Sequence, residues 1–312
     1  MMPWTALRSQ GVLGINARNI QFTQGENPRR LYPLVDDKLK TKALCQNAGI
    51  KVADVLGKAE RHGDVVRFIE DLEETDDFVL KPAMGAMGNG IMVLHEATES
   101  GWVASGDRAV TREEVAYHAK DIISGLYALG GQQDVAYAEE RLRLHPDFEP
   151  ISCDGVPDIR VVVYRGVPVM AMTRLPTKRS SGRANLHHGA VGTGVDLRSG
   201  RTSHAIVQNV PVDRHPDTGE RVVDYPIPHF HEAVRLAVRA TDETGLGYVG
   251  ADVVIDSRYG PVILELNARP GLAIQSANRA GLLPRLTKLR GTPRGDLDSR
   301  IELGRSLARG VR

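Results

Sequence analysis

The sequence predicts an α+β fold. Over its 312 residues, β-branched runs and helical patterns come in mixed clusters, whereas a doubly wound sheet would show strict strand–helix alternation. Two pairs of apolar runs are separated by short turn sequences, Arg165-Gly166 and residues 257–260, as in antiparallel hairpins. There is no internal repeat. The length suits one large domain or two to three smaller ones.

Composition and charge narrow the class of protein. The apolar share is 41% and the charged share 25%, which is typical of a globular protein, and the net charge of +1 favours neither nucleic acid nor a membrane surface. Residues 1–6 lack the basic and apolar regions of a signal peptide. The longest apolar stretch, residues 161–172, is too short to span a bilayer. We therefore expect a cytoplasmic protein with no membrane span.

The two cysteines, Cys45 and Cys153, have no metal-binding spacing, and a disulfide between them is not expected. Cys45 falls within a helical pattern, where we expect it to pack as a small hydrophobe. This cysteine usage is consistent with a reducing compartment.

In the first half of the chain, residues 1–35 show no sustained period and predict an irregular, extended lead-in. A helix is predicted from Asp36 or Asp37 to Asn47, ended by Gly49. Thr111 is predicted to cap a helix that reaches about Leu129. The other predictions here are a helix over 64–72, a strand over 78–82, a strand over 90–94 and an excursion over 101–107.

In the second half, strand patterns dominate. Predicted strands cover residues 135–144, 159–164, 167–173, 248–256 and 261–266, and residues 174–194 read as a polar segment with glycines. Helices are predicted from Pro228 or His229 to Thr244 and over residues 298–308.

Oxygen-bearing side chains mark the last predicted hairpin. Glu265 and Asn267 are two residues apart on a strand, so their side chains point to the same face. Asp252 lies in the apolar run of the partner strand, where a charge is rarely buried without a partner. Together these three oxygen ligands suit Mg²⁺ that also takes phosphate oxygens of a substrate. A polar cluster facing solvent is the alternative, although it leaves the nearby Arg269 unexplained; that arginine could neutralise charge developing in a transition state.

A lysine before a glycine-rich turn suggests a phosphate site. Lys81 ends a strand and is followed by Gly85, Gly88 and Gly90, whose small size lets backbone N–H groups approach an anion. The segment is neither a Walker A sequence nor a Rossmann fingerprint. It would form a lid over a triphosphate, and an ordinary hairpin loop is the alternative. Lys38, at the start of the first helix, either reaches the same phosphates or lies on the surface.

Two further arginine sites flank the central strands. Asp158 and Arg160 start one strand, and Arg183 precedes Asn185; each arginine could instead form a simple salt bridge. His187 and His188 resemble a metal pair, but adjacent residues on a strand face opposite ways, so chelation by both is not expected. His187 is a candidate hydrogen-bond donor.

The order of these motifs resembles the ATP-grasp superfamily, closest to alpha-L-glutamate ligases of the RimK type and their sugar-transfer-associated relatives. The resemblance covers about residues 36–280. It rests on motifs at Asp37-Lys38, Phe78–Ala83, Tyr137–Leu142, Pro157–Arg160, Arg183–Gly189, Gly250–Asp252 and Glu265–Gly271.

The resemblance implies two α+β subdomains that clamp a nucleotide. It assigns residues 36–135 to a small subdomain with the glycine flap and a helical insert, residues 136–290 to a large subdomain with the metal site, and residues 291–312 to a C-terminal helix and tail. Such ligases usually carry a separate N-terminal domain before the Asp-Lys helix, whereas only about 35 residues precede it in this sequence, so a truncated N-terminal region is expected.

The resemblance also implies roles for single residues. Lys38 and Lys81 would touch phosphates, and Glu140, with Glu139 as the alternate, would lie near the adenine or ribose. Asp158 would belong to the nucleotide site. The remaining implied roles are nucleotide and acyl-phosphate contacts for Arg183 and Asn185, magnesium binding for Asp252, Glu265 and Asn267, and contacts with the reacting carboxylate for Arg160 and Arg269.

The expected activity is ATP- and Mg²⁺-dependent (or Mn²⁺-dependent) ligation of a carboxylate to an amine through an acyl phosphate, with a glutamate-like amino acid implied by the resemblance alone. Substrates would be small molecules or peptides, with no nucleic acid, and a homo-oligomer stays open. Two alternatives remain: a nucleotide-responsive binding or scaffold protein without turnover, and a kinase acting on a small-molecule hydroxyl.

Overall fold

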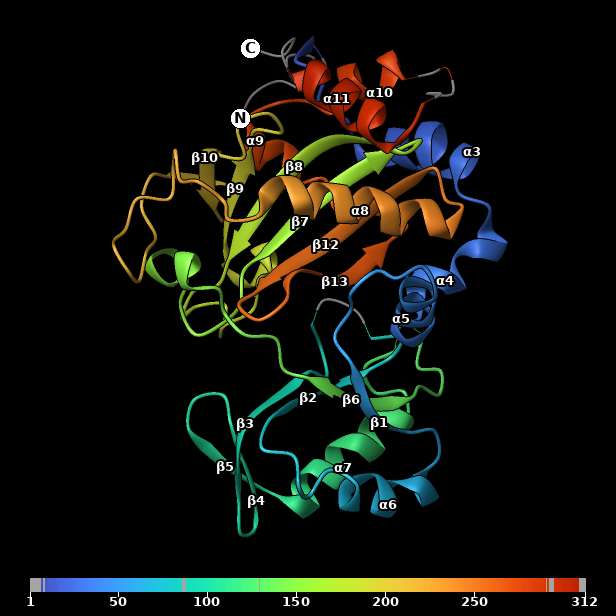
Figure 1. The fold of residues 1–312 in the computed structure, drawn as a ribbon, viewed down its shortest axis with the longest axis vertical. Coiled ribbons are helices and arrows are strands. Elements are labelled where there is room, and N and C mark those ends of the chain that lie inside the picture. Colours follow the sequence, from blue (N-terminus) through green and yellow to red (C-terminus); the bar gives the residue numbers. More distant parts are fainter. Residues whose placement is uncertain are drawn as a thin grey trace. The chain divides into compact units, whose positions relative to one another are not determined.

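The computed structural model describes residue 7, residues 9–85, 88–128, 130–289, residue 291 and residues 295–308. It divides into two compact units. Unit 1 contains residues 1–36, 40–52 and 143–312, and unit 2 contains residues 37–39 and 53–142. Each unit has its own antiparallel sheet and helices, so the predicted α+β class is confirmed (Figure 1).

Unit 1 is built on a seven-stranded antiparallel sheet with the order β11-β10-β9-β8-β7-β12-β13. Its strands are β7 (Asp158–Tyr164), β8 (Val167–Leu175), β9 (Val191–Val195), β10 (Thr202–Val207), β11 (Val210–Val212), β12 (Tyr248–Asp256) and β13 (Gly260–Asn267). Both predicted hairpins are confirmed as β7–β8 and β12–β13. The turn between β7 and β8 has positive φ at Arg165 and Gly166, as a two-residue type I′ turn requires.

One face of this sheet is covered by α8 (Phe230–Thr244), which crosses it in Figure 1. Small residues on the helix, such as Ala233 and Ala237, pack against strand residues such as Val161 and Val253 in one apolar core. The helix was predicted within two residues of its start, because its apolar residues recur with helical spacing.

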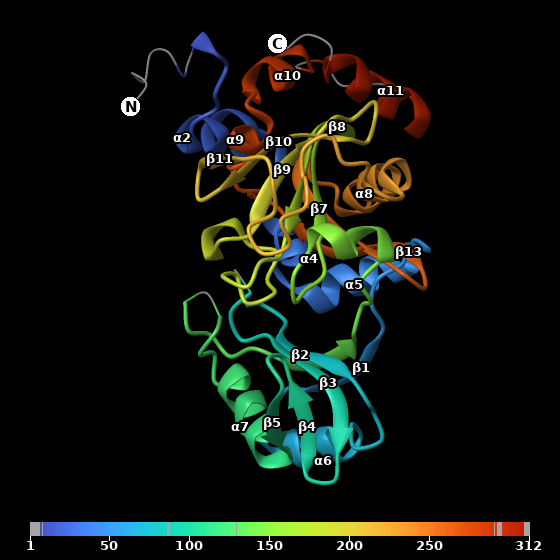
Figure 2. The ribbon, with the colours of Figure 1, turned by 90° about the vertical axis from the view of Figure 1, so that its left-hand side faces the viewer.

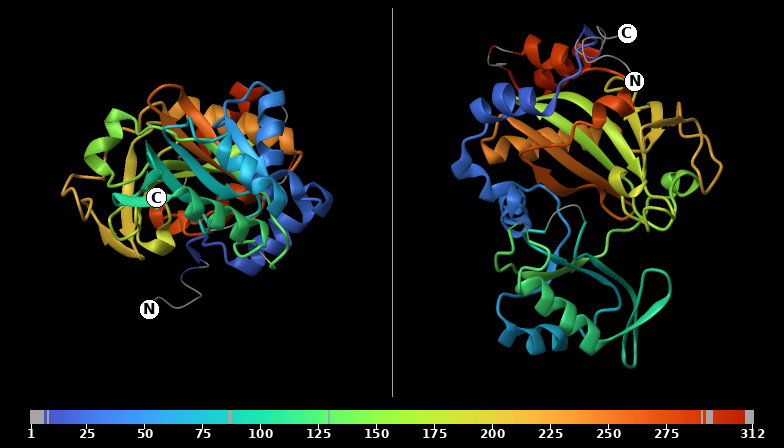
Figure 3. Two further views of the ribbon diagram at one scale, coloured as in Figure 1. Left: turned by 90° about the horizontal axis from the view of Figure 1, so that it is seen from below. Right: turned by 180° about the vertical axis from the view of Figure 1, so that it is seen from behind.

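The other face packs against the N-terminal segment and the helices near the C-terminus, seen from behind in Figure 3. The helices on the C-terminal side are α9 (Ile274–Asn278), α10 (Leu283–Lys288) and α11 (Leu297–Leu307). The last of these confirms the predicted C-terminal helix; residues 309–312 of the predicted tail lie outside the described residues.

The prediction of an extended lead-in was wrong for the described part of residues 1–35. They form short helical turns: α2 (Ile15–Ala17), the π-helix η1 (Arg18–Thr23), α3 (Gln24–Glu26), η2 (Arg29–Leu31) and α4 (Pro33–Asp36). Tertiary hydrogen bonds hold them in place. The Asn27 amide bonds the backbone of Tyr248 and Ala268, and the Gln275 amide bonds both N–H and C=O of Leu13. Such turns are stabilised by distant residues and leave no periodic pattern.

Unit 2 contains a six-stranded antiparallel sheet with the order β1-β6-β2-β3-β4-β5 (Figure 2). The strands are β1 (Val55–Ala59), β2 (Phe78–Pro82), β3 (Met92–Thr98), β4 (Gly101–Ala104), β5 (Arg108–Thr111) and β6 (Ala136–Glu140). The helices α6 (Val65–Glu70) and α7 (Arg112–Ile123) pack on one face through a core that includes Phe78 and Leu80.

Thr111 caps α7 as predicted, in a capping box with Glu114. The helix ends at Ile123, earlier than the predicted end near Leu129, which itself lies outside the described residues. The start of α5 (Lys38–Asn47) also agrees with its prediction.

The predicted excursion over 101–107 was wrong, because this segment supplies β4 and the turn to β5. Trp102 lies 5.2 Å from Phe78, ring to ring, and is fully buried. Ser105-Gly106-Asp107 carries turn residues with positive φ at Gly106 and Asp107, so a hairpin turn was mistaken for a loop.

Among the described residues, no helix combines the length and the apolar character needed to cross a bilayer. Cys45 and Cys153 are both free thiols, and Cys45 is fully buried as predicted.

Candidate functional site

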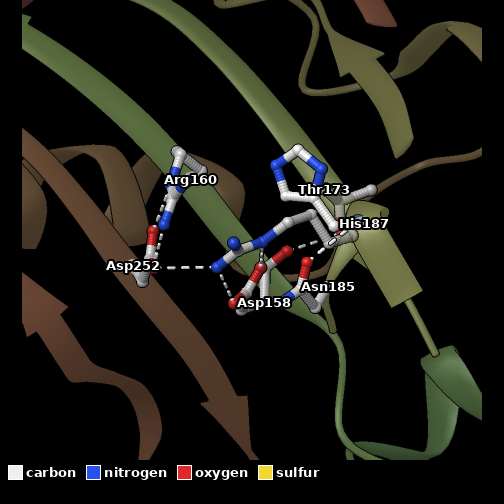
Figure 4. Close-up of polar contacts among 7 residues, drawn as sticks. Asp158, Arg160, Thr173, Asn185, His187 and Asp252 are labelled. Carbon is white, nitrogen blue, oxygen red and sulfur yellow. Dashed lines mark hydrogen bonds and ion pairs between the residues drawn. The ribbon is translucent and has the colours of Figure 1, made fainter. Parts of the chain in front are cut away.

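The strongest polar feature of unit 1 is an ion pair between Arg160 on β7 and Asp252 on β12. The two residues are direct cross-strand neighbours in the antiparallel ladder. Nε of Arg160 donates to Oδ1 of Asp252 at 2.7 Å and Nη2 donates to Oδ2 at 2.5 Å, so the pair is bidentate. Figure 4 shows the two side chains pointing toward each other above the sheet. Asp252 is only 2% exposed. Buried charges are rarely found without a partner, and Arg160 is the partner that the apolar sequence around Asp252 did not reveal.

Arg174 extends this network, and the sequence analysis missed it. It lies opposite Asp158 in the β7–β8 ladder and pairs with both oxygens of that carboxylate. Its Nη2 also donates to Oδ2 of Asp252 at 2.8 Å. Two carboxylates and two guanidinium groups therefore balance one another within a buried layer. Arg174 reaches the two carboxylates because of the register between β7 and β8. The sequence alone shows only an arginine at the end of an apolar run and does not show this register.

Burial and ion pairing act in opposite directions on the two acids. Burial would raise the pKa of Asp252, but the guanidinium groups of Arg160 and Arg174 outweigh it and hold that pKa at about 2. Burial raises the pKa of Asp158, with Arg174 opposing the shift. Asp252 is therefore the more firmly ionised of the two.

Glu265 and Asn267 lie on β13, next to Asp252. Glu265 is directly opposite Asp252, and Asn267 is two residues further along the same strand, so all three face the same side of the sheet. Within the described residues, the half-buried Glu265 carboxylate makes no hydrogen bond or ion pair. The amide oxygen of Asn267 accepts the backbone N–H of Arg269 at 2.9 Å.

This donor set fits Mg²⁺, which takes oxygen ligands and completes its shell with water or phosphate. Glu265 offers a free carboxylate and Asn267 an amide oxygen. Asp252 already accepts three guanidinium N–H groups, so it has less capacity left than Glu265. In the part of the chain that the structure describes, no cluster of three or more His, Cys, Asp or Glu side chains could hold a metal on its own.

The segment after β8 carries Arg183, Asn185 and His187. The Asn185 side chain accepts the backbone N–H of His187 at 2.9 Å and caps the 3-10 helix η5 (Leu186–His188) (Figure 4). The two histidines thus lie in a helical turn, whereas the argument against joint chelation assumed a strand. No side-chain partner of Arg183 is present among the described residues.

Unit 2 holds the predicted phosphate residues on the sheet face opposite its helices. Lys81 on β2 forms a buried ion pair with Glu139 on β6, and the ring of Tyr137 lies 6.0 Å from the lysine Nζ. The Tyr137 and Glu139 side chains reach this face because they alternate with the core residues Ala136 and Ala138. Glu140, at the end of β6, accepts the backbone N–H of Asp54 at 3.1 Å.

The loop after Lys81 is tied to the start of α5. Nζ of Lys38 donates to the carbonyl of Gly85 at 2.6 Å, and the backbone N–H of Lys38 donates to Ala83. The carboxylate of Asp134 accepts the backbone N–H of Met84 at 3.0 Å, a contact with no signal in the sequence. Lys38 is therefore held against the predicted flap, as opposed to lying free on the surface.

The glycines of the flap meet different requirements. A Cβ on Gly85 would lie 2.2 Å from the Pro82 ring, so no side chain fits there. Gly88 and Gly90 have positive φ, which side-chain-bearing residues rarely adopt. Ala86 and Met87 of the flap lie outside the described residues.

Arg269 follows β13 in unit 1. Its guanidinium lies over the Tyr32 ring, 5.2 Å from the centroid, and at 4.0 Å from the Asp36 carboxylate. The side chain is about half exposed, so it is available to a ligand at low cost. The predicted site residues thus fall into two groups, and their shared role in one site stays a prediction.

The chain was then compared with known proteins. A family profile described as sugar-transfer associated ATP-grasp matches residues 17–291. The comparison with curated proteins found no significant match.

Among solved structures, the chain is similar to the ATP-grasp ligase PsnB complexed with minimal precursor, with 18% identity and a TM-score of 0.45 over 89% of this chain and 63% of that one. It is also similar to D-alanine–D-alanine ligase from Bacillus anthracis, with 13% identity and a TM-score of 0.46 over 89% and 70% of the two chains. The chain is similar to the D-cycloserine synthetase DcsG as well, with 12% identity and a TM-score of 0.45 over 91% of this chain and 73% of that one.

The chain therefore spans less than two thirds of the length of PsnB. Because the family profile covers most of the sequence, and the α+β sheets carry the predicted motifs in order, this chain belongs to the sugar-transfer associated ATP-grasp family and has the ATP-grasp fold.

Proposed function

We propose that this protein is an ATP- and Mg²⁺-dependent ligase that joins a carboxylate to an amine through an acyl phosphate. The observation that carries the proposal is the row of oxygen ligands at Asp252, Glu265 and Asn267, held in register on β12 and β13 in a chain of the ATP-grasp family. A glutamate-like amino acid is the proposed donor, following the sequence resemblance.

In unit 1, Glu265 and Asn267 would bind the metal, and Asp252 would support them. Arg160 and Arg174 keep Asp252 ionised and fix the orientation of its carboxylate. The remaining lone pair, which would accept from a metal-bound water or bind the metal, therefore has a fixed direction. When bound, magnesium would neutralise phosphate charge and orient the phosphoryl oxygens.

In unit 2, Lys81 and Lys38 would bind the phosphates of ATP. Lys81 is buried against Glu139, and phosphate oxygens would compete with that carboxylate for its ammonium group. The glycines of the flap would let backbone N–H groups approach the phosphates. Glu139 or Glu140 would lie near the adenine or ribose.

The proposed chemistry has two steps. A carboxylate oxygen attacks the γ-phosphorus of ATP, the bond to the bridging oxygen breaks, and ADP leaves. An amine nitrogen then attacks the acyl carbon, loses a proton, and expels inorganic phosphate to leave an amide. Arg269, which is about half exposed, would neutralise charge on the reacting acyl group. Positioning and charge neutralisation would supply most of the rate enhancement.

The test is to incubate the purified protein with Mg-ATP and pairs of carboxylates and amines, L-glutamate among them. Phosphate release and the mass of the product are measured together, because an amide, a phosphorylated alcohol and plain ATP hydrolysis give different masses. An amide formed with one ADP per product supports the proposal. Intact ATP binding without ADP formation for any pair contradicts it.

Variants sharpen this test. Glu265→Gln keeps the shape of the side chain and removes one metal-binding charge, so amide formation should fall at least about 100-fold. The matched control is Glu243→Gln, which changes an exposed glutamate on α8 and should retain activity. Lys81→Met should weaken ATP binding, whereas Lys120→Gln on the exposed side of α7 should leave it unchanged.

A further inference from the structure

Arg18 is a buried cation without an anion. It lies in the π-helix η1 and is only 5% exposed. No acidic side chain among the described residues forms an ion pair with it. Buried charges are normally paired, because an unpaired one loses its hydration without compensation. A single-turn π-helix is itself common at functional sites.

The contacts of Arg18 leave one edge of its guanidinium unused. Nε donates to the Asn19 side chain at 2.8 Å, and Nη1 donates to the carbonyl of Pro270 at 2.7 Å. In the described part of the chain Nη2 has no partner, yet it is not among the fully buried polar atoms that lack one. This nitrogen is therefore not completely enclosed by protein atoms.

The surroundings of Arg18 add positive charge. Burial lowers the pKa of Arg18, Tyr248 opposes this shift, and Arg269 adds to it. The hydrogen bond from Arg18 to the carbonyl of Pro270 also brings Arg18 next to the residue that follows Arg269. Two neighbouring cations are the complement of a carboxylate.

The contact with Pro270 places Arg18 beside the end of β13. Pro270 directly follows Arg269 and lies three residues after Asn267, the last residue of β13, so the hydrogen bond holds Arg18 against the segment that follows the proposed metal ligand. Arg160 is already paired with Asp252 through two nitrogens, whereas Arg18 donates through Nε and Nη1 to neutral acceptors only.

A purely structural role is the alternative, in which Arg18 only fastens the N-terminal segment. Arg285 on α10 is the example within this chain: it is 8% exposed, donates to the carbonyl of Val169, and has a pKa lowered by burial. Its hydrogen-bond acceptor Val169 lies on β8, whereas the acceptor of Arg18 follows β13. Arg285 therefore provides a control for the loss of a buried arginine away from the end of β13.

Resting on the proposed ligase activity, we propose that Arg18, together with Arg269, binds a carboxylate group of the substrate. The N-terminal segment would thus supply a substrate-binding residue to unit 1. The unpaired edge of the guanidinium donates to one carboxylate oxygen, and the exposed Arg269 neutralises the remaining charge.

Direct binding tests the subsite independently of turnover. The wild type, Arg18→Gln, Arg18→Lys and Arg285→Gln are titrated with acetate, succinate, L-glutamate and inorganic phosphate in the presence of Mg²⁺ and a non-hydrolysable ATP analogue. At least one carboxylate should bind the wild type, and Arg18→Gln should weaken it about ten-fold or more, since a charged hydrogen bond is lost. Arg18→Lys should retain part of the affinity, and Arg285→Gln should retain all of it.

Three results overturn the proposal: unchanged carboxylate affinity in a folded Arg18→Gln protein, no binding of any carboxylate to the wild type, or Arg18-dependent binding of phosphate alone. Circular dichroism and the affinity for the ATP analogue establish that each variant is folded. ADP formation is measured in parallel. Absence of ADP together with Arg18-dependent carboxylate binding contradicts the ligase activity and still supports the carboxylate subsite.

Discussion

Arg160 and Asp252 face each other across neighbouring strands and share two hydrogen bonds in a buried layer of unit 1. Replacing Arg160 with Met would leave Asp252 with only the contact from Arg174. Because breaking a buried pair from one side costs about 3–5 kcal/mol and Arg174 still compensates part of the charge, the free energy of unfolding should fall by up to about that amount. Urea denaturation followed by circular dichroism measures this change.

The control for that prediction is Arg201→Gln, which removes the exposed ion pair with Asp224. Water and salt screen such a pair, so the unfolding curve should hardly move. Equal effects of the two substitutions would show that the Arg160–Asp252 pair is not buried in solution.

The loss of folding stability at low pH should depend on Asp252. Its pKa is about 2 in the folded protein, below the value of about 4 for an unfolded carboxyl group. A lowered pKa means that the folded state holds the proton less tightly, so the contribution is present above pH 4 and is lost as the pH falls toward 2. The loss should be about 2 kcal/mol.

Unfolding free energies between pH 2 and pH 5 test this prediction in the wild type and in Asp252→Asn. The variant should be less stable at pH 5 and should show a shallower decline below pH 4. If the free energy of unfolding fell equally with pH in both proteins, carboxylates other than Asp252 would be responsible for the loss of stability at low pH.

The two cysteines should react at different rates. Burial raises the pKa of the Cys45 thiol to about 11, and its side chain is fully enclosed, whereas Cys153 is partly exposed with a pKa raised mainly by burial. Since the thiolate is the reactive form, iodoacetamide should label Cys153 first, and faster at pH 9 than at pH 7. Peptide mass mapping identifies the site, and urea should expose Cys45. Early labelling at Cys45 would contradict the packing of α5.

Tyr248→Phe should not destabilise the protein. The hydroxyl is buried without a partner, and such a group costs about 1–3 kcal/mol when it is unsatisfied. Removing it should therefore leave the free energy of unfolding unchanged or raise it, while the aromatic contacts with Tyr164 persist. Tyr164→Phe serves for comparison, because the Tyr164 hydroxyl donates to Glu26. A loss of more than about 1 kcal/mol in Tyr248→Phe would show that its hydroxyl is hydrogen-bonded in solution.

Much of the fold could be predicted from local signals. The β7–β8 hairpin follows from two apolar runs around Arg165-Gly166, and α8 follows from its spacing of apolar residues. In contrast, β9, β10 and β11 were not predicted, because residues 191–212 contain glycines and short runs whose pairing is specified only by the neighbouring strands. Local patterns therefore predicted the elements whose own residues show a turn sequence or a periodic spacing of apolar residues.

The site shows the same division. Glu265 and Asn267 were predicted from a two-residue spacing, and the structure places them on one strand face next to Asp252. Arg174 and Arg18 could not be found this way, since the role of each depends on a register or on a contact with a residue far along the chain. Long-range register is the information that a single sequence does not display.

All of unit 2 except residues 37–39 is inserted into unit 1, between Val52 and Arg143. During synthesis, residues 53–142 leave the ribosome as one stretch that contains all six strands of its sheet. The central strands of the other sheet, β7 and β12, emerge about 90 residues apart, so unit 1 stays incomplete until β12 and β13 are made. Residues 53–142 should therefore fold first on the ribosome. Unit 1 should fold later, from the segments synthesised before and after them.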